Sequence, residues 1–197
     1  MKTPDFEQAM AYALDLLAAR LAPDLTYHNL WHTQADVMPA VERLAKVHGV
    51  SAADRQLLRV AAAYHDTGFT VQYEEHERAG VGIMRRSLPQ FGFDEAQIAY
   101  IAELIMATRL PQSPRDLLGA ILADADLDVL GRDDFFVRSE ALRRETAVYR
   151  ELISPEVWRE QQLDFLEAHH YFTPAARAQR QPGKEAHMQL LRSWIAR

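Results

Sequence analysis

The sequence predicts an all-α protein, a single compact domain of roughly eight or nine helices over residues 1–197. Apolar residues recur at intervals of three and four along most of the chain, which is the period of an amphipathic helix. No segment alternates apolar and polar residues as a half-buried strand does. A chain of this length can bury roughly 70% of its unfolded surface, so the domain needs no disulfide.

Four Ser/Thr-Pro pairs indicate helix starts, because the hydroxyl residue is a good N-cap and proline suits the first helical position. The pairs are Thr3-Pro4, Ser113-Pro114, Ser154-Pro155 and Thr173-Pro174. The expected helices lie at about 6–21, 29–48, 51–68, 74–88, 94–108, 114–130, 133–151, 155–168 and 184–196. Residues 178–183, with the sequence AQRQPG, are expected to form the loop before the last helix.

The composition limits the compartment and the partners. The chain has no Cys, 22 Lys+Arg and 28 Asp+Glu, for a net charge of −6. The lack of Cys excludes thiolate metal sites and Cys nucleophiles, and it favours a reducing cytoplasm. The acidic balance, with scattered basic residues, argues against duplex nucleic acid as the main partner. No apolar stretch approaches the roughly 18 residues of a membrane span, so we expect no membrane partner.

Two histidine-containing strings carry the first chemical signal, YHNLWHT at 27–33 and AAAYHDTGF at 61–69. On a helix, His28 and His32 would project from one face and reach a common centre, although ordinary core or surface histidines also show this spacing. His65 and Asp66 end an Ala-rich helix that is expected to be buried on nearly all sides. A buried carboxylate needs a cation or a raised pKa, so a metal is the economical partner. An internal His–Asp hydrogen bond is the alternative.

A third string, AILADADLDVLG at 120–131, places three aspartates in an otherwise apolar segment. Asp124 and Asp128 share one helical face, whereas Asp126 points elsewhere. We expect one of the three to meet the His65-Asp66 pair. The alternative is an amphipathic helix whose acids line its solvated side.

The order His32, His65-Asp66 and an aspartate of ADADLD resembles the metal-ligand signature of the HD-domain phosphohydrolase superfamily, which is all-helical. YHNLWHTQADV is similar to the Y-H-N-x-x-H-[AT]-x-x-D-V string of cyclic-nucleotide phosphodiesterases. The C-terminal strings DLDVLG, RRE, WREQQLDFL and YFTPAAR look more like those of small bacterial predicted metal-dependent HD phosphohydrolases.

The resemblance implies a role for each matched residue. His28 would be the general acid, and the metal ligands would be His32, His65, Asp66 and Asp126. Asp124 is the alternative to Asp126, because the Ala-Asp pair at 123–124 also fits the family string. Asp66 has two oxygens and would also act in catalysis by bridging to a second, weaker metal.

Two imidazoles and two carboxylates suit Mn, Fe, Co, Ni, Zn or, less well, Mg. The implied activity is hydrolysis of a small phosphate ester, a nucleotide or cyclic nucleotide, by metal-activated water. His76 and Arg78 are candidate substrate-binding residues. His76 and Gly80 also resemble the start of a second histidine-rich site, but the later string ELIMATR lacks histidine, so a full second site is not expected. The alternatives are a metal-retaining helical binding or regulatory module and an HD-type diiron oxygenase.

Overall fold

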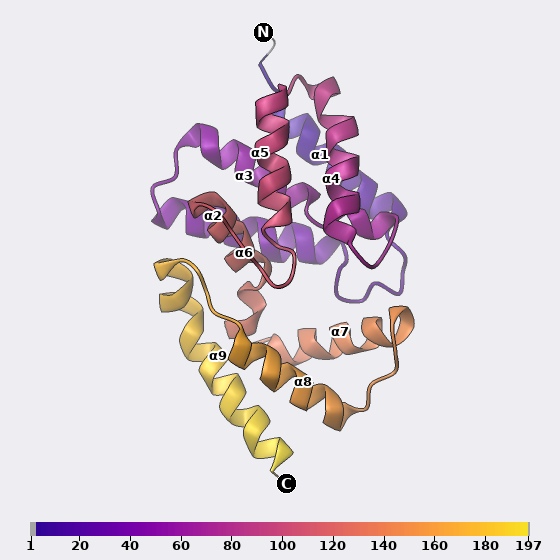
Figure 1. Ribbon diagram of the computed structural model, residues 1–197, viewed down its shortest axis with the longest axis vertical. Helices are drawn as coiled ribbons and strands as arrows, with labels where there is room; N and C mark the ends of the chain where they lie inside the picture. Colours follow the sequence, from indigo (N-terminus) through magenta and orange to yellow (C-terminus); the bar gives the residue numbers. More distant parts are fainter. Residues whose placement is uncertain (1–2, 197) are drawn as a thin grey trace.

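The computed structural model describes residues 3–196, and this part of the chain folds into nine α-helices without a strand (Figure 1). The α-helices are α1 (Phe6–Arg20), α2 (Met38–Val47), α3 (Ala52–Tyr64), α4 (His76–Ser87), α5 (Glu95–Met106), α6 (Leu117–Asp126), α7 (Phe135–Tyr149), α8 (Pro155–Ala168) and α9 (Pro174–Ile195). A π-helix (His32–Val37) precedes α2, and short 3₁₀ segments lie at Thr67–Thr70, Leu88–Phe91 and Asp128–Gly131. The all-α prediction is confirmed. None of the described helices is long and apolar enough to cross a membrane.

The helix starts follow side-chain capping more than the Ser/Thr-Pro pattern alone. Ser154 and Thr173 cap α8 and α9 as expected. The first and second pairs were wrong as caps, because α1 begins after Asp5 and α6 begins after Asp116, each accepting a backbone N–H three residues on. A carboxylate at this position satisfies an unpaired amide and also favours the positive end of the helix dipole.

The expected loop at residues 178–183 is also wrong, because α9 runs through it without a break. An internal proline removes one helical hydrogen bond and normally costs about 3 kcal/mol, so packing must hold this segment helical. Gly183 lies against Gly131, and a Cβ built on Gly183 would stand 2.3 Å from the Gly131 carbonyl oxygen. Lys184, also buried, donates to the carbonyl oxygens of Leu166 and His169 near the end of α8.

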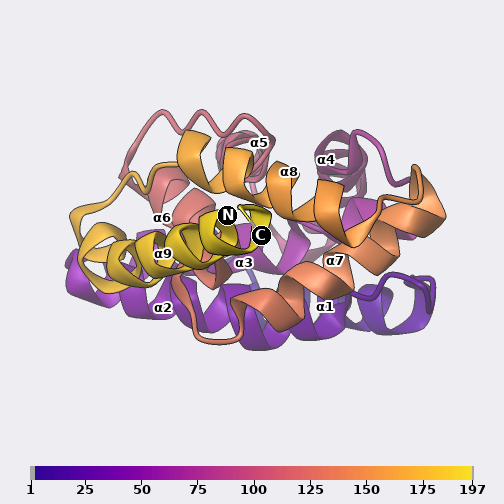
Figure 2. The ribbon, with the colours of Figure 1, turned by 90° about the horizontal axis from the view of Figure 1, so that it is seen from below.

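Helix α3 lies at the centre of the N-terminal helices and contacts α1, α2, α5 and α6. Its segment Val60–Tyr64 is fully buried. The small alanine side chains in this segment let the neighbouring helices pack closely against it. The helices α7, α8 and α9 lie together below this body in Figure 1, and Figure 2 looks onto them from below. The cavity described next is lined both by residues of the N-terminal half and by residues of α7 and α8.

Candidate metal centre and adjoining cavity

Four side chains from three parts of the fold meet at one buried point. His32 comes from the π-helix, His65 and Asp66 follow α3, and Asp126 ends α6. One ligand atom from each of His32, His65 and Asp66 lies within 4.8 Å of the others. Asp126 Oδ1 lies 3.1 Å from His32 Nε2 and 3.4 Å from His65 Nε2. The separation between His65 Nε2 and Asp66 Oδ2 is 3.2 Å.

Two atoms of this cluster lack a hydrogen-bond partner although they are buried. They are His65 Nε2 and Asp66 Oδ2. His65 Nδ1 lies 2.8 Å from the Ala62 carbonyl oxygen, which can only accept, so Nδ1 donates a proton there and Nε2 is the ring nitrogen that faces the carboxylates and is available to a cation. Imidazole nitrogen and carboxylate oxygen together suit a divalent transition metal. The donor set therefore fits a cation held by His32, His65, Asp66 and Asp126.

The two carboxylates are held in their charged form. Burial alone would raise the pKa of Asp66, but attraction to His65 holds it far below its usual range. Burial likewise opposes ionisation of Asp126, but the hydrogen bond with His32 and the nearby His65 ring outweigh it and lower its pKa. Two ionised carboxylates in a buried site make a strongly negative centre, which is the electrostatic condition for binding a cation.

Behind His32, Asp36 forms an ion-pair network that sequence reasoning did not single out. Its Oδ2 lies 3.8 Å from His32 Nδ1, and its carboxylate binds Arg132 at 2.6 Å and Arg138 at 3.0 Å. Burial raises the pKa of Asp36, but hydrogen bonds from His32 and Arg132 bring it to about 2. The π-helix supplies the local geometry, and such segments recur at functional sites. Asp36 thus backs the ring of His32 from the side opposite the cluster.

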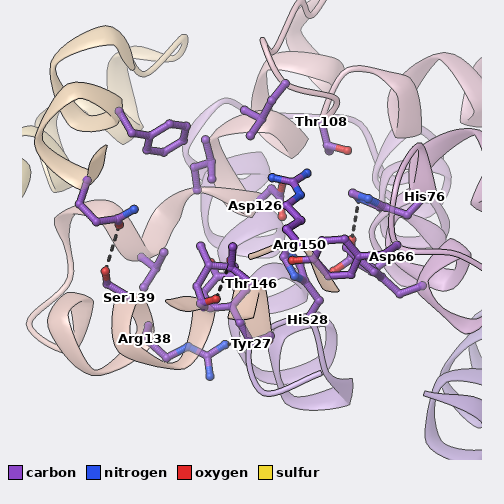
Figure 3. Close-up of a pocket in the computed structure, with 18 of the residues that line it drawn as sticks. Tyr27, His28, Asp66, His76, Thr108, Asp126, Arg138, Ser139, Thr146 and Arg150 are labelled. Atoms are coloured by element: carbon purple, nitrogen blue, oxygen red, sulfur yellow. Dashed lines mark hydrogen bonds and ion pairs between the residues drawn. The ribbon is translucent and has the colours of Figure 1, made fainter. Parts of the chain in front are cut away.

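His28 is held by Glu145, the second residue that sequence reasoning missed. His28 donates from Nδ1 to Glu145 Oε1, and the buried Glu145 also accepts the backbone N–H groups of Tyr27 and His28 at 2.7 and 3.0 Å. Tyr73 donates its hydroxyl to the same carboxylate at 3.2 Å. The second ring nitrogen of His28, Nε2, is left for the cavity, where Figure 3 shows the residue beside Asp66. The only sequence signal for Glu145 was an acid within the RRE string of α7.

The three aspartates of the ADADLD string have different partners. Both carboxylate oxygens of Asp124 accept backbone N–H groups, from Phe172 and Thr173, each at 2.8 Å. Asp128 binds the guanidinium groups of Arg43 and Arg180. Asp126 is the one of the three that lies beside the histidines.

Of the two candidate substrate-binding residues, His76 lies at the cavity and Arg78 does not. His76 Nε2 lies 3.7 Å from Asp66 Oδ1, and its ring stacks on Phe69 with 3.9 Å between centroids. Arg78 is 64% exposed, pairs with Glu75 at 3.1 Å and is absent from the cavity lining of the described chain. The arginines that do line the cavity are Arg109, Arg138 and Arg150.

The cluster opens into a cavity of about 550 Å³. Asp66 and Asp126 line one end of it, together with His28 and His76. The opposite side is formed by residues of α7 and α8, and Ser139 lies far from His76 in the view of Figure 3. A volume of this size fits a small organic ligand rather than an ion alone.

The comparisons with known proteins agree with this geometry. The family model described as HD domain matches residues 16–128, which include His28 and all four clustered residues. Neither the curated proteins nor the solved structures gave a match. Because the matched segment covers more than half of the chain, the protein belongs to the HD-domain family, within the superfamily of metal-dependent phosphohydrolases.

Proposed function

We propose that this protein hydrolyses a small phosphate ester, a nucleotide or a cyclic nucleotide, at a divalent metal held by His32, His65, Asp66 and Asp126. The observation that carries the proposal is the pair of unpartnered buried atoms, His65 Nε2 and Asp66 Oδ2, beside a cavity of organic-ligand size. A bound divalent ion supplies electrostatic activation of water and of the phosphoryl group. Manganese, iron, cobalt, nickel, zinc and magnesium are the candidates.

His28 supplies the proton to the departing oxygen. Its Nδ1–H is donated to Glu145, so the ring is fixed in orientation and only Nε2 remains for the substrate. A proton on Nε2 is the one that the ring can donate to the departing oxygen. The two carboxylate oxygens of Asp66 face different residues: Oδ2 lies beside His65, and Oδ1 faces His76.

The charges of the cavity favour a substrate with few phosphate groups. Each lining arginine is paired with an acid: Arg109 with Glu75, Arg138 with Asp36 and Arg150 with Glu74. Among the cavity-lining residues of the described chain, no arginine or lysine is free of an acidic partner. A triphosphate would bring several negative charges to this acidic surface without a free cation to meet them. The proposed partner is therefore a small phosphorylated molecule with one phosphate.

The test is ester hydrolysis by the full chain after metal removal and reloading with each candidate ion. We expect metal-dependent release of phosphate from nucleoside monophosphates, or ring opening of cyclic nucleotides to the monophosphate measured by chromatography, and loss of the reaction in His65→Ala. Metal binding without hydrolysis of any ester would instead support the regulatory module. Iron-dependent oxygen consumption would support the oxygenase, although the described cluster offers only two histidine ligands. A cytoplasmic location stays a prediction from the composition.

A further inference from the structure

We propose that the α7–α8 side of the cavity binds the organic part of the substrate as a planar ring, and that Gln162 selects rings with a carbonyl acceptor, as in a keto-substituted nucleobase. This inference rests on the proposed function, because the phosphate must lie at the metal end for the ring to reach α8. It concerns residues beyond 128, where the family match ends.

The first step is size and surface. A phosphate group at the metal end would fill only a small part of the 550 Å³ cavity. The walls away from the metal combine polar side chains with apolar and aromatic ones, and the apolar set includes Val129, Leu130, Phe135, Leu142, Trp158 and Phe165. Rigid apolar walls favour a flat, poorly hydrated group over a flexible polar one. This is the environment of a ring rather than of a sugar alone.

The second step is an oriented amide in this apolar wall. Trp158 Nε1 donates to Ser139 Oγ at 2.9 Å, and Ser139 Oγ donates to Gln162 Oε1 at 3.0 Å. Trp158 and Ser139 are buried, so the bond between them is shielded from solvent, and the bond from Ser139 to the half-buried Gln162 is partly shielded. The serine hydroxyl has one proton, and it donates that proton to the amide oxygen of Gln162. Gln162 therefore presents its Nε2 as a donor.

The third step is that this donor is not used by the protein. Within residues 3–196 no acceptor binds Gln162 Nε2, and the residue lines the cavity. A ring carbonyl would accept a hydrogen bond from Gln162 Nε2. A ring amino group at the same place is itself a donor, so it would leave Nε2 without an acceptor. The predicted preference is thus for keto over amino rings of the same shape.

The experiment uses two matched pairs of probes, inosine with adenosine 5′-monophosphate and uridine with cytidine 5′-monophosphate. Each pair differs in a carbonyl against an amino group at one ring position, and with it in an N–H group against a lone pair at the adjacent ring nitrogen. Binding to the metal-loaded protein is measured by calorimetry, and hydrolysis by phosphate release. We expect the keto member to bind roughly two- to twelvefold more tightly, the range of one neutral hydrogen bond.

Two substitutions test the assignment to Gln162. Gln162→Leu should bring the ratio of the two dissociation constants within each pair close to one. Gln162→Glu should reverse it, because Ser139 can still donate to one carboxylate oxygen while the other becomes an acceptor facing the ring. Gln161→Leu is the matched control one residue away, and it should preserve the keto preference. Circular dichroism and melting curves check that each variant is folded.

The outcomes separate this inference from the proposed function. If the unaltered protein hydrolyses nitrophenyl phosphate with metal but binds both members of each pair equally, the inference is overturned and the phosphohydrolase proposal stands. If no ester is hydrolysed but the keto preference appears in calorimetry, the ring site stands and the proposed reaction fails. A preference that survives Gln162→Leu, or disappears in Gln161→Leu, overturns the assignment to Gln162.

Discussion

Glu145 on α7 holds the imidazole of His28, 117 positions earlier in the chain, through a hydrogen bond at Nδ1. The same carboxylate accepts two backbone N–H groups of the segment that carries His28. Burial raises the pKa of Glu145, but the hydrogen bond from His28 outweighs it and keeps the pKa below its usual range. A residue outside the matched HD segment thus fixes the orientation of a residue inside it.

The first prediction concerns this pair. His28→Gln should lower turnover about 10²- to 10⁴-fold while metal content stays unchanged, because a positioned acid contributes that much to rate. Glu145→Gln should lower turnover at least about tenfold by loosening the ring. Both losses should shrink with a nitrophenolate leaving group, which needs little protonation, and kcat on nitrophenyl and alkyl esters measures this. Equal losses on both esters would remove His28 from the acid role.

The second prediction distinguishes the two aspartates of the Ala-Asp-Ala-Asp segment. Asp126→Asn should reduce metal content in elemental analysis, with a small change in stability. Asp124→Asn is the matched control: it should retain the metal but lower the free energy of unfolding by about 1–3 kcal/mol, because it weakens the acceptor of two backbone N–H groups at the start of α9. Metal loss in Asp124→Asn alone would transfer the ligand role to that residue.

The third prediction links the metal to stability. An ion that binds only the folded state adds about 2.7 kcal/mol at a hundredfold excess over Kd. Removal by a chelator should therefore lower Tm, and titration with metal should restore it. His65→Ala, which removes one of the clustered nitrogens, should show a Tm that no longer responds to metal. A chelator-insensitive Tm in the unaltered protein, after metal loss has been verified, would contradict a site that joins three parts of the fold.

The fourth prediction is a pH dependence at the end of α8, away from the cavity. Burial and the nearby Lys184 ammonium lower the pKa of His169 from its usual 6.5 to about 3. Between these values the unfolded chain binds a proton that the folded chain does not, so stability falls as pH drops below 6.5. From pH 7 to pH 5 this group should cost about 2 kcal/mol.

The measurement for His169 is urea unfolding at pH 7 and at pH 5 in the unaltered protein and in His169→Gln. The variant cannot take up the proton, so its loss of stability over this interval should be smaller by about 2 kcal/mol. His170→Gln, an exposed neighbour, is the control and should behave like the unaltered protein. Identical pH dependence in His169→Gln would show that His169 titrates normally in the folded state.

Much of the secondary structure could be predicted from the sequence, because helix formation depends on local spacing and capping. The 3.6-residue period revealed the helices, and Ser51, Ser154 and Thr173 marked three of their starts. The histidine and aspartate strings also indicated a buried polar cluster, since such residues in apolar helices require partners. The resemblance to the HD superfamily, confirmed by the family match, rested on these short strings.

Tertiary structure alone decided the features that depend on residues far apart in the chain. Asp126 and Asp124 fit the same sequence string, and only packing turned one toward the histidines and the other toward the start of α9. The hydrogen bond between His28 and Glu145 joins two elements that lie far apart in the chain, and no local sequence pattern predicts it. The orientation of the Gln162 amide likewise depends on Ser139, which lies on another helix. Helix α9 passes through Pro182 because its close contact with Gly131 outweighs local propensity. Local periodicity determines which segments are helical, but the free energy of long-range packing determines which side chains meet.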